Sequence, residues 1–181
     1  MKPKVVVLVC LVSLLVMVIP FSACGSKEKT LSDLAIKIEW VDPIAIAAKP
    51  YDAPKSLGNE YTTYHVILGI DNPNDFLVTV DWLEATAYAN QLRTGLVQID
   101  SAIYIPPGKK ALVRMPITLN TLKSVQELVV GRQMSAGDAT KLVLDTWQAL
   151  QDGKAICRLV GAARVVADTT TRHQNFDIRW R

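Results

Sequence analysis

The chain has 181 residues, of which half are hydrophobic and a fifth are charged, and its formal net charge is +3. This length gives room for one domain of ordinary size. Lys2 and Lys4 precede a hydrophobic run at the N-terminus, and the residues after Ala23 carry 18 basic and 17 acidic side chains, a net charge of +1. Because nucleic-acid binding depends on lysines and arginines concentrated on one face, this balance argues against a nucleic-acid partner.

The N-terminus has the layout of a secretory signal peptide. Its two lysines are followed by a run of fifteen residues, Val5 to Ile19, in which Ser13 is the clearly polar member. As a helix this run would span about 22 Å, which is less than the hydrocarbon layer of a membrane. We therefore expect residues 1–23 to be a cleaved signal peptide rather than a permanent membrane span.

Soon after the hydrophobic run come Phe21, the small residues Ser22 and Ala23, and then Cys24. This order resembles the lipobox of bacterial lipoproteins, with Phe21 at a position where an aliphatic residue is usual. The resemblance implies cleavage after Ala23 and a diacylglyceryl group on Cys24. The alternative is an uncleaved N-terminal anchor, against which Pro20 argues because proline disturbs a spanning helix.

Residues 24–31 are mostly small or charged and are typical of a flexible tether. Since two or more acyl chains hold a protein firmly at a membrane, we expect lipid anchoring on the extracytoplasmic side of the cell envelope.

Cys10 would leave with the signal peptide and Cys24 would be acylated, which leaves Cys157 in the domain at 32–181. An intramolecular disulfide is then excluded, and a hydrophobic core must stabilise the domain.

Alternating apolar and polar residues predict β-strands through most of this domain. The pattern of a strand with one buried face occurs at 34–40, 61–70 and 76–90. Near Trp82 and Leu83 two apolar residues adjoin and the alternation shifts. We interpret this shift as a bulge or a bend between two sheets.

Further strands are expected at 96–105 and 111–119, and the last two near 157–165 and 176–180. Pro116 lies on the outward side of its strand, and since proline cannot donate to a ladder, that strand should run along a sheet edge. About seven strands separated by turn residues are typical of an immunoglobulin-like or fibronectin III-like antiparallel β-sandwich.

A helical insertion is expected at about 121–150, where the hydrophobic period changes to that of a helix. Ser124 and Glu127 have the spacing of a capping box, which predicts a helix start at Ser124. Asp138 should precede a second helix, and Gly153 should end it.

The densest turn signal is Asn72, Pro73 and Asn74. Proline fixes one backbone angle, and asparagine side chains can hydrogen-bond their own backbone and tolerate left-handed geometry. The chain can therefore reverse at low cost here, and we favour a structural role over a binding role for both asparagines.

From residue 64 onward the sequence resembles the type 2 late embryogenesis abundant (LEA) domain, also called the water stress and hypersensitive response (WHy) domain. The resemblance is carried by the asparagine-proline turn, the strand at 78–90, the segment 105–108 and the strand that contains Gly161. The helical stretch at 121–150 is longer than typical members have. The family implies a fibronectin-like sandwich and an association with desiccation and other stress, without an agreed catalytic residue.

Catalytic and metal-binding candidates are sparse, and we expect a non-catalytic protein that needs no cofactor. Cys157 and His173 are a minimal thiol–base pair, but cysteine on an apolar strand face usually behaves as a small buried hydrophobe. Asp71, Asp75 and Asp81 offer oxygen ligands for calcium, yet their spacing matches no known loop. Exposed turn acids are the favoured interpretation.

Each of the four tryptophans falls on the apolar side of a predicted element: Trp40, Trp82, Trp147 and Trp180. We therefore favour core packing over a platform for a sugar or another ligand.

Three functions remain open. The resemblance favours a membrane-tethered module that protects client proteins or the envelope during desiccation. The tether would also raise the effective concentration of an interaction or assembly module in an envelope complex. The amphipathic helix could instead cover one end of the sandwich in a carrier of an apolar ligand.

Overall fold

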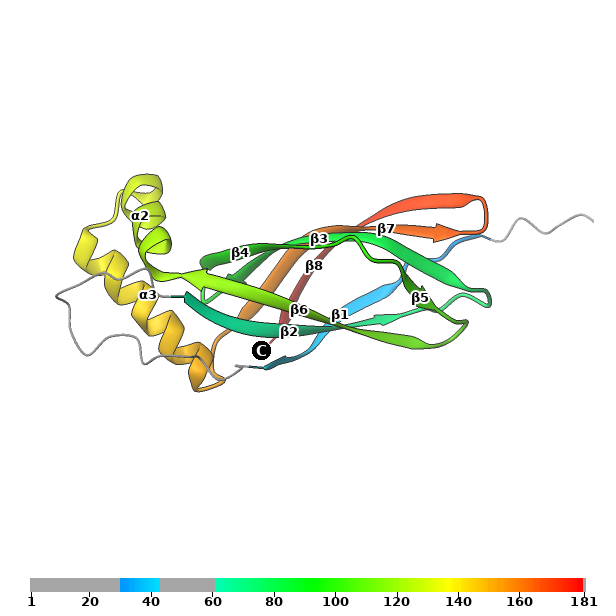
Figure 1. The fold of residues 1–181 in the computed structure, drawn as a ribbon, viewed down its shortest axis with the longest axis horizontal. Coiled ribbons are helices and arrows are strands. Elements are labelled where there is room, and N and C mark those ends of the chain that lie inside the picture. The colour runs from blue at the N-terminus through cyan, green and yellow to red at the C-terminus, as the bar shows by residue number, and fades with distance from the viewer. Residues whose placement is uncertain (1–29, 43–60, 181) are drawn as a thin grey trace, which may run out of the picture. The chain divides into compact units, whose positions relative to one another are not determined.

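The computed structural model describes residues 30–42 and 61–180, and the described residues from Leu31 onward form one compact unit. Figure 1 shows two antiparallel β-sheets packed face to face, with two helices late in the chain. The predicted mainly β sandwich is confirmed.

The smaller sheet has the order β1-β2-β6, with β1 at Ala35–Asp42, β2 at Tyr61–Asp71 and β6 at Lys110–Asn120. Pro116 therefore lies on an edge strand, as predicted. The larger sheet has the order β4-β3-β7-β8, formed by β3 at Val78–Ala89, β4 at Leu92–Ile99, β7 at Cys157–Ala167 and β8 at Thr170–Trp180. The short strand β5, Ile103–Ile105, pairs with the beginning of β3.

The single strand predicted at 96–105 is wrong, because the chain divides it into β4 and β5. The division follows the bend of their shared partner: β4 pairs with β3 from Leu83 to Ala89, and β5 pairs with β3 from Val78 to Val80. The described residues thus contain eight strands instead of about seven.

The irregularity predicted near Trp82 is a bulge in β3. Val80 pairs with Val165 and Trp82 pairs with Arg164, so Asp81 is an extra residue on the β3 side. An extra residue reverses the faces to which the following side chains point. Trp82 accordingly lies on the outer face, half-buried, and its predicted place in the core is wrong.

A second bulge redirects Trp40. Ile38 pairs with Leu68 and Trp40 pairs with Ile67, so Glu39 is the extra residue of β1. Trp40 is 44% exposed, and its predicted core position is also wrong. Trp147 is buried and Trp180 packs partly buried against the core, as expected.

Helix α2, Thr121–Arg132, is capped four residues earlier than the capping-box spacing predicts. Its N-cap is Asn120, the last residue of β6, whose Oδ1 accepts a hydrogen bond from the backbone N–H of Lys123 at 2.8 Å. Ser124 lies inside the helix and is buried, so the predicted start at Ser124 is wrong. The asparagine at the strand end supplies the cap first.

Helix α3, Ala136–Gln151, is capped by Ser135, whose Oγ accepts a hydrogen bond from the backbone N–H of Asp138 at 3.1 Å. Asp138 is thus in the first turn rather than before the helix. Gly153 follows the helix in the left-handed conformation, φ +64°, and ends it as predicted. In the described part of the chain, neither helix has the length and apolar character needed to cross a bilayer.

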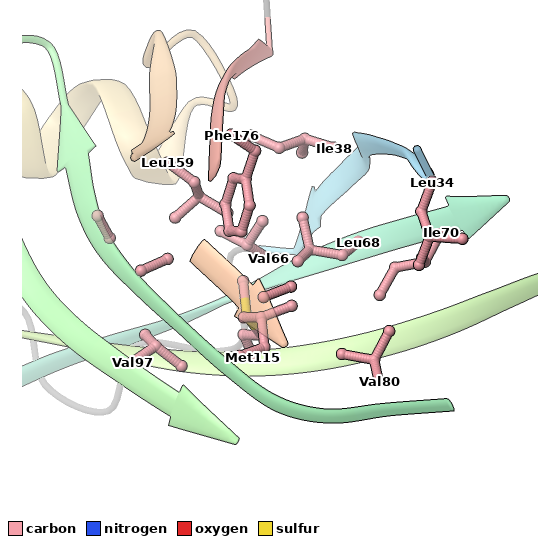
Figure 2. Packing of buried hydrophobic residues seen from close by; sticks show 14 of the residues in the cluster. Leu34, Ile38, Val66, Leu68, Ile70, Val80, Val97, Met115, Leu159 and Phe176 are labelled. Atoms are coloured by element: carbon pink, nitrogen blue, oxygen red, sulfur yellow. The ribbon is translucent and has the colours of Figure 1, made fainter. Parts of the chain in front are cut away.

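Apolar side chains from both sheets fill the space between them. Figure 2 shows Val66, Leu68 and Met115 of the smaller sheet near Leu159 and Phe176 of the larger one. Inside this layer the hydroxyl of Tyr64 lies 2.6 Å from that of Thr94. Burial raises the pKa of Tyr64, so its hydroxyl stays protonated and joins the two sheets by a hydrogen bond.

A smaller apolar cluster attaches the helices to the ends of β4 and β6. Its buried members are Leu92, Leu119, Val125, Leu128, Ala139 and Val143. We call this end of the sandwich the helical end. At the opposite end lie the β2–β3 turn and the β7–β8 turn (Figure 1).

Candidate functional site

Asn72, the first asparagine of the turn motif, is 2% exposed, and its side-chain amide makes several hydrogen bonds. Its Nδ2 donates to the carbonyl oxygens of Phe76 at 2.9 Å, Ile105 at 2.9 Å and Pro106 at 3.2 Å. Its Oδ1 accepts from the backbone N–H of Asn74 at 3.0 Å. One side chain therefore joins the β2–β3 turn to the β5–β6 turn.

The second asparagine extends this network to the start of the domain. Asn74 Oδ1 accepts from the backbone N–H of Ser32 at 2.8 Å, and Asn74 Nδ2 donates to the Ser32 carbonyl at 3.4 Å. On the other side, Gln174 of β8 exchanges two hydrogen bonds with the backbone of Leu34. We call this part of the molecule the asparagine end. It holds the segment through which the chain enters the sandwich, and Pro73 is exposed on its surface.

The three aspartates near the turn do not meet. Asp81 accepts a hydrogen bond from Arg164 Nε of β7 at 2.8 Å, and this contact lowers the pKa of Asp81. Asp71 lies 3.7 Å from Lys110 Nζ, and Asp75 is exposed. Within residues 30–42 and 61–180, no three metal-ligating side chains gather closely enough to hold a metal ion.

Cys157 and His173 lie near opposite ends of the β7–β8 ladder. Cys157 is opposite Trp180 in register, and His173 is opposite Arg164. Cys157 is also 1% exposed and faces the core. The structure thus does not bring the thiol and the imidazole together.

The most distinctive surface is the outer face of the larger sheet, built from alternate residues of β3, β7 and β8. Along β3 these are Trp82, Glu84, Thr86 and Tyr88, all partly exposed, while the residues between them are buried. The ring of Trp82 meets the ring of His173 edge to face, with centroids 6.4 Å apart. Aromatic, charged and hydroxyl side chains therefore share one face.

The middle of this outer face is hollowed. A cavity of about 590 Å³ is lined by residues of all three strands, among them Trp82, Thr86, Val160, Ala162, Asn175 and Asp177. The short side chains on β7 form its floor. A Cβ on Gly161, between Val160 and Ala162, would stand 2.0 Å from the carbonyl oxygen of Glu84, so glycine lets β3 and β7 approach.

Ion pairs flank the hollow on both sides. Arg164 pairs with Asp81 near Trp82, and Arg158 pairs with Asp177 through Nε at 2.7 Å. The Arg158 guanidinium lowers the pKa of Asp177, as Arg164 lowers that of Asp81. Both carboxylates stay charged to lower pH than usual, so the face displays fixed charges of both signs.

Sequence reasoning missed this face as a site. The alternation of side chains along β3 after the shift could have revealed it. Counted in steps of two from Trp82, Glu84, Thr86 and Tyr88 lie on the same face, opposite to the face of Leu83. The predicted cleavage and lipid-attachment residues, Phe21, Ser22, Ala23 and Cys24, lie outside the described residues.

Comparison with known proteins adds a likeness of fold. No protein-family model matches this sequence, and no curated protein matches it. Among solved structures, a protein from Archaeoglobus fulgidus is 10% identical with a TM-score of 0.41, covering 83% of this chain and 94% of its own.

Two further structures are similar at the same level. A structural-genomics target solved by X-ray crystallography is 10% identical with a TM-score of 0.48, covering 81% of this chain and 84% of its own. A candidate LEA protein solved in solution is 9% identical with a TM-score of 0.32, covering 83% and 72%. At these values the similarity concerns the fold alone.

Proposed function

We propose that this protein is a non-catalytic lipoprotein of the cell envelope whose LEA type 2-like sandwich protects neighbouring proteins or the membrane surface when water is lost. The lipobox-like order ending in Cys24 and the sequence resemblance from residue 64 onward support the anchor and the domain type. The observation that carries the proposal is the outer face of the larger sheet, an accessible surface with fixed charges of both signs, hydroxyl and amide groups and a half-buried tryptophan.

Such a face suits protection for a physical reason. Glu84, Thr86 and Asn175 are at least partly exposed and offer hydrogen-bonding groups to the solvent. When water is withdrawn, these groups can bond the polar surface of a client, which reduces contact between clients. The buried layer beneath them keeps the surface rigid, so little ordering entropy is lost on binding.

The tether sets the range of this action. Six residues separate Cys24 from Leu31, and six extended residues reach about 20 Å. A lipid on Cys24 would thus confine the sandwich to a thin layer next to the membrane and raise its effective concentration there.

The interior of the sandwich offers less support for an apolar carrier. Buried side chains of both sheets occupy the space between them, and the hollow of about 590 Å³ opens on the outer face with polar residues in its wall. The alternative function, an interaction or assembly module in an envelope complex, would use the same outer face. It differs from a protective function because the module would bind one recurrent partner.

The anchor is tested by mass spectrometry of protein purified from membranes. We expect an acylated Cys24 at the N-terminus, and a Cys24→Ser variant should be recovered without lipid. An intact Met1 on the native protein would contradict the anchor.

Protection is tested by drying a labile enzyme such as lactate dehydrogenase beside vesicles that carry this protein, and measuring the activity after rehydration. We expect more activity than with an equal mass of lysozyme. Trp82→Ala should reduce the protection, whereas Trp40→Ala, which removes an exposed tryptophan from the other sheet, should leave it unchanged. Equal activity with lysozyme and with this protein would refute protection.

A further inference from the structure

A second cavity lies near the helical end, and arginines from three elements line it. Its volume is about 650 Å³, within the range of roughly 300–1,000 Å³ that small-ligand sites occupy. Arg132 comes from the last turn of α2, Arg158 from the start of β7 and Arg179 from the end of β8. The wall also includes Tyr88 and the exposed side chain of Ile156.

The register of the larger sheet places like charges next to each other. Tyr88, Arg158 and Arg179 are directly opposite one another across β3, β7 and β8. Two arginines that face each other in a ladder repel and destabilise the pair. An anion between them would convert this repulsion into attraction.

Two of the three guanidinium groups, those of Arg158 and Arg132, are held in place before any ligand arrives. Arg158 is fixed by Asp177 and lies over the Tyr88 ring, 5.9 Å from its centroid. Arg132 donates from an Nη atom to the carbonyl oxygen of Gln91 at 3.1 Å.

The turn that carries Gln91 is itself fixed. Asn90 and Gln91 have φ of +46° and +73°, a left-handed conformation that non-glycine residues rarely adopt. Two hydrogen bonds of 2.9 Å secure the turn, from Asn90 N–H to the Ile156 carbonyl and from Ile156 N–H to Asn90 Oδ1. The Gln91 carbonyl that orients Arg132 is therefore firmly positioned.

Positive charge exceeds negative charge at this cavity. Asp177 pairs with Arg158, while Arg132 and Arg179 form no ion pair with any residue in the described part of the chain. This excess stands out in a chain whose charges are otherwise nearly balanced after Ala23.

We propose that this cavity binds the phosphate group of a small organic phosphate ester. A planar carboxylate is satisfied by one guanidinium, whereas a tetrahedral phosphate accepts hydrogen bonds from several directions, as three arginines from separate elements offer. The cavity is larger than a bare phosphate needs, and Tyr88 and Ile156 provide a wall for the organic part. The assignment is independent of the lipid anchor and of protection on drying.

The test is calorimetric titration of the purified protein in a maltoside detergent, which carries no phosphate. The probes are phenyl phosphate, benzoate and inorganic phosphate. We expect phenyl phosphate to bind most tightly, and Arg179→Ala and Arg132→Ala each to weaken it at least tenfold. Arg179→Lys should recover part of the loss because the charge stays.

Arg114→Ala is the matched control, since Arg114 is an exposed, ion-paired arginine on the smaller sheet. It should change phenyl phosphate affinity less than twofold, and thermal melting should show all variants folded. Equal losses from Arg114→Ala and Arg179→Ala, or benzoate binding as tight as phenyl phosphate, would overturn the proposal.

A lipid headgroup is the other source of a phosphate ester, and vesicles distinguish it. Arg179-dependent binding to phosphatidylglycerol vesicles, absent with phosphatidylcholine and without affinity for phenyl phosphate, would assign the cavity to a membrane surface and overturn a small-molecule ligand. Phenyl phosphate binding without vesicle binding supports the proposal.

Discussion

The two ends of the sandwich are held together by different kinds of contact. At the asparagine end, Asn72 and Asn74 join two turns and the entering chain through hydrogen bonds between 2.8 and 3.4 Å. At the helical end, a cluster of buried apolar side chains attaches α2 and α3 to β4 and β6. Hydrogen bonds depend on the identity and direction of each atom, whereas apolar packing depends mainly on volume.

This difference predicts how each end responds to substitution. Asn72→Asp changes one atom of the side chain, which alters its hydrogen bonding and keeps its shape. At the asparagine end we expect even this change to lower the free energy of unfolding strongly. The helical end should tolerate a change of shape at constant volume and respond to lost volume. Substitutions at Asn72, Leu128 and Thr146 separate these responses.

The largest effect is expected for Asn72→Ala. It would leave the buried carbonyl of Ile105 and the N–H of Asn74 without their present partner, and each buried unsatisfied group costs about 1–3 kcal/mol. We expect a loss of about 4 kcal/mol in the free energy of unfolding, measured by urea unfolding followed by tryptophan fluorescence.

Two further variants make this test specific. Asn72→Asp keeps the shape but replaces the donor with a carboxylate oxygen facing carbonyl oxygens, and it should be nearly as destabilising as alanine. Asn175→Ala removes an exposed asparagine of the outer face and should cost under about 0.5 kcal/mol. A mild effect of Asn72→Asp would show that shape, rather than hydrogen bonding, holds the asparagine end.

A smaller loss is expected at the helical end for Leu128→Ala. Leu128 is 3% exposed in the apolar cluster, and truncation of a buried leucine removes packing and leaves a cavity. We expect a loss of about 3 kcal/mol in the same assay, and less than about 1.5 kcal/mol for Leu128→Met, which conserves volume.

Val130 supplies the control on the same helix because it is 81% exposed. Val130→Ala should change the free energy of unfolding by less than about 0.5 kcal/mol. If Leu128→Met proved as costly as Leu128→Ala, the helical end would depend on side-chain shape and the contrast between the ends would disappear.

The local patterns in the sequence account for the turn and for most of the strands, but not for the direction of every side chain. The asparagine-proline turn is predictable because its logic lies within three adjacent residues. The shift in β3 predicts a bulge or a bend, and the structure has the bulge. The outward direction of Trp82 is not predicted, because it depends on which residue of β3 lacks a partner in β7. That register is set by a strand more than seventy residues away in the chain.

The arginine cavity illustrates the same limit. Arg158 and Arg179 become neighbours through the β7–β8 register, and Arg132 joins them through the packing of α2. The spacing of these three arginines in the sequence does not predict that they lie close together. The predicted start of α2 is wrong for a more local reason. Asn120 and Ser124 are both good N-caps, and Asn120 takes this role because β6 ends there.

The smallest effect, and the one of opposite sign, is expected inside the helical end. Thr146 of α3 is fully buried, and its Oγ1 has no hydrogen-bond partner among the residues that the structure describes. Thr146→Val keeps the shape and removes an unsatisfied hydroxyl, so the free energy of unfolding should rise by about 1 kcal/mol in urea unfolding.

Thr140 on the same helix is the matched control, since its Oγ1 donates to the carbonyl oxygen of Ala136 at 2.8 Å. Thr140→Val should therefore give no gain. If Thr146→Val alone stabilises the protein, removing a polar atom raises the free energy of unfolding at the helical end. The same kind of change lowers it at the asparagine end. If Thr146→Val lowered the stability instead, the hydroxyl would have a hydrogen-bonding role there, and the helical end could no longer be treated as apolar packing.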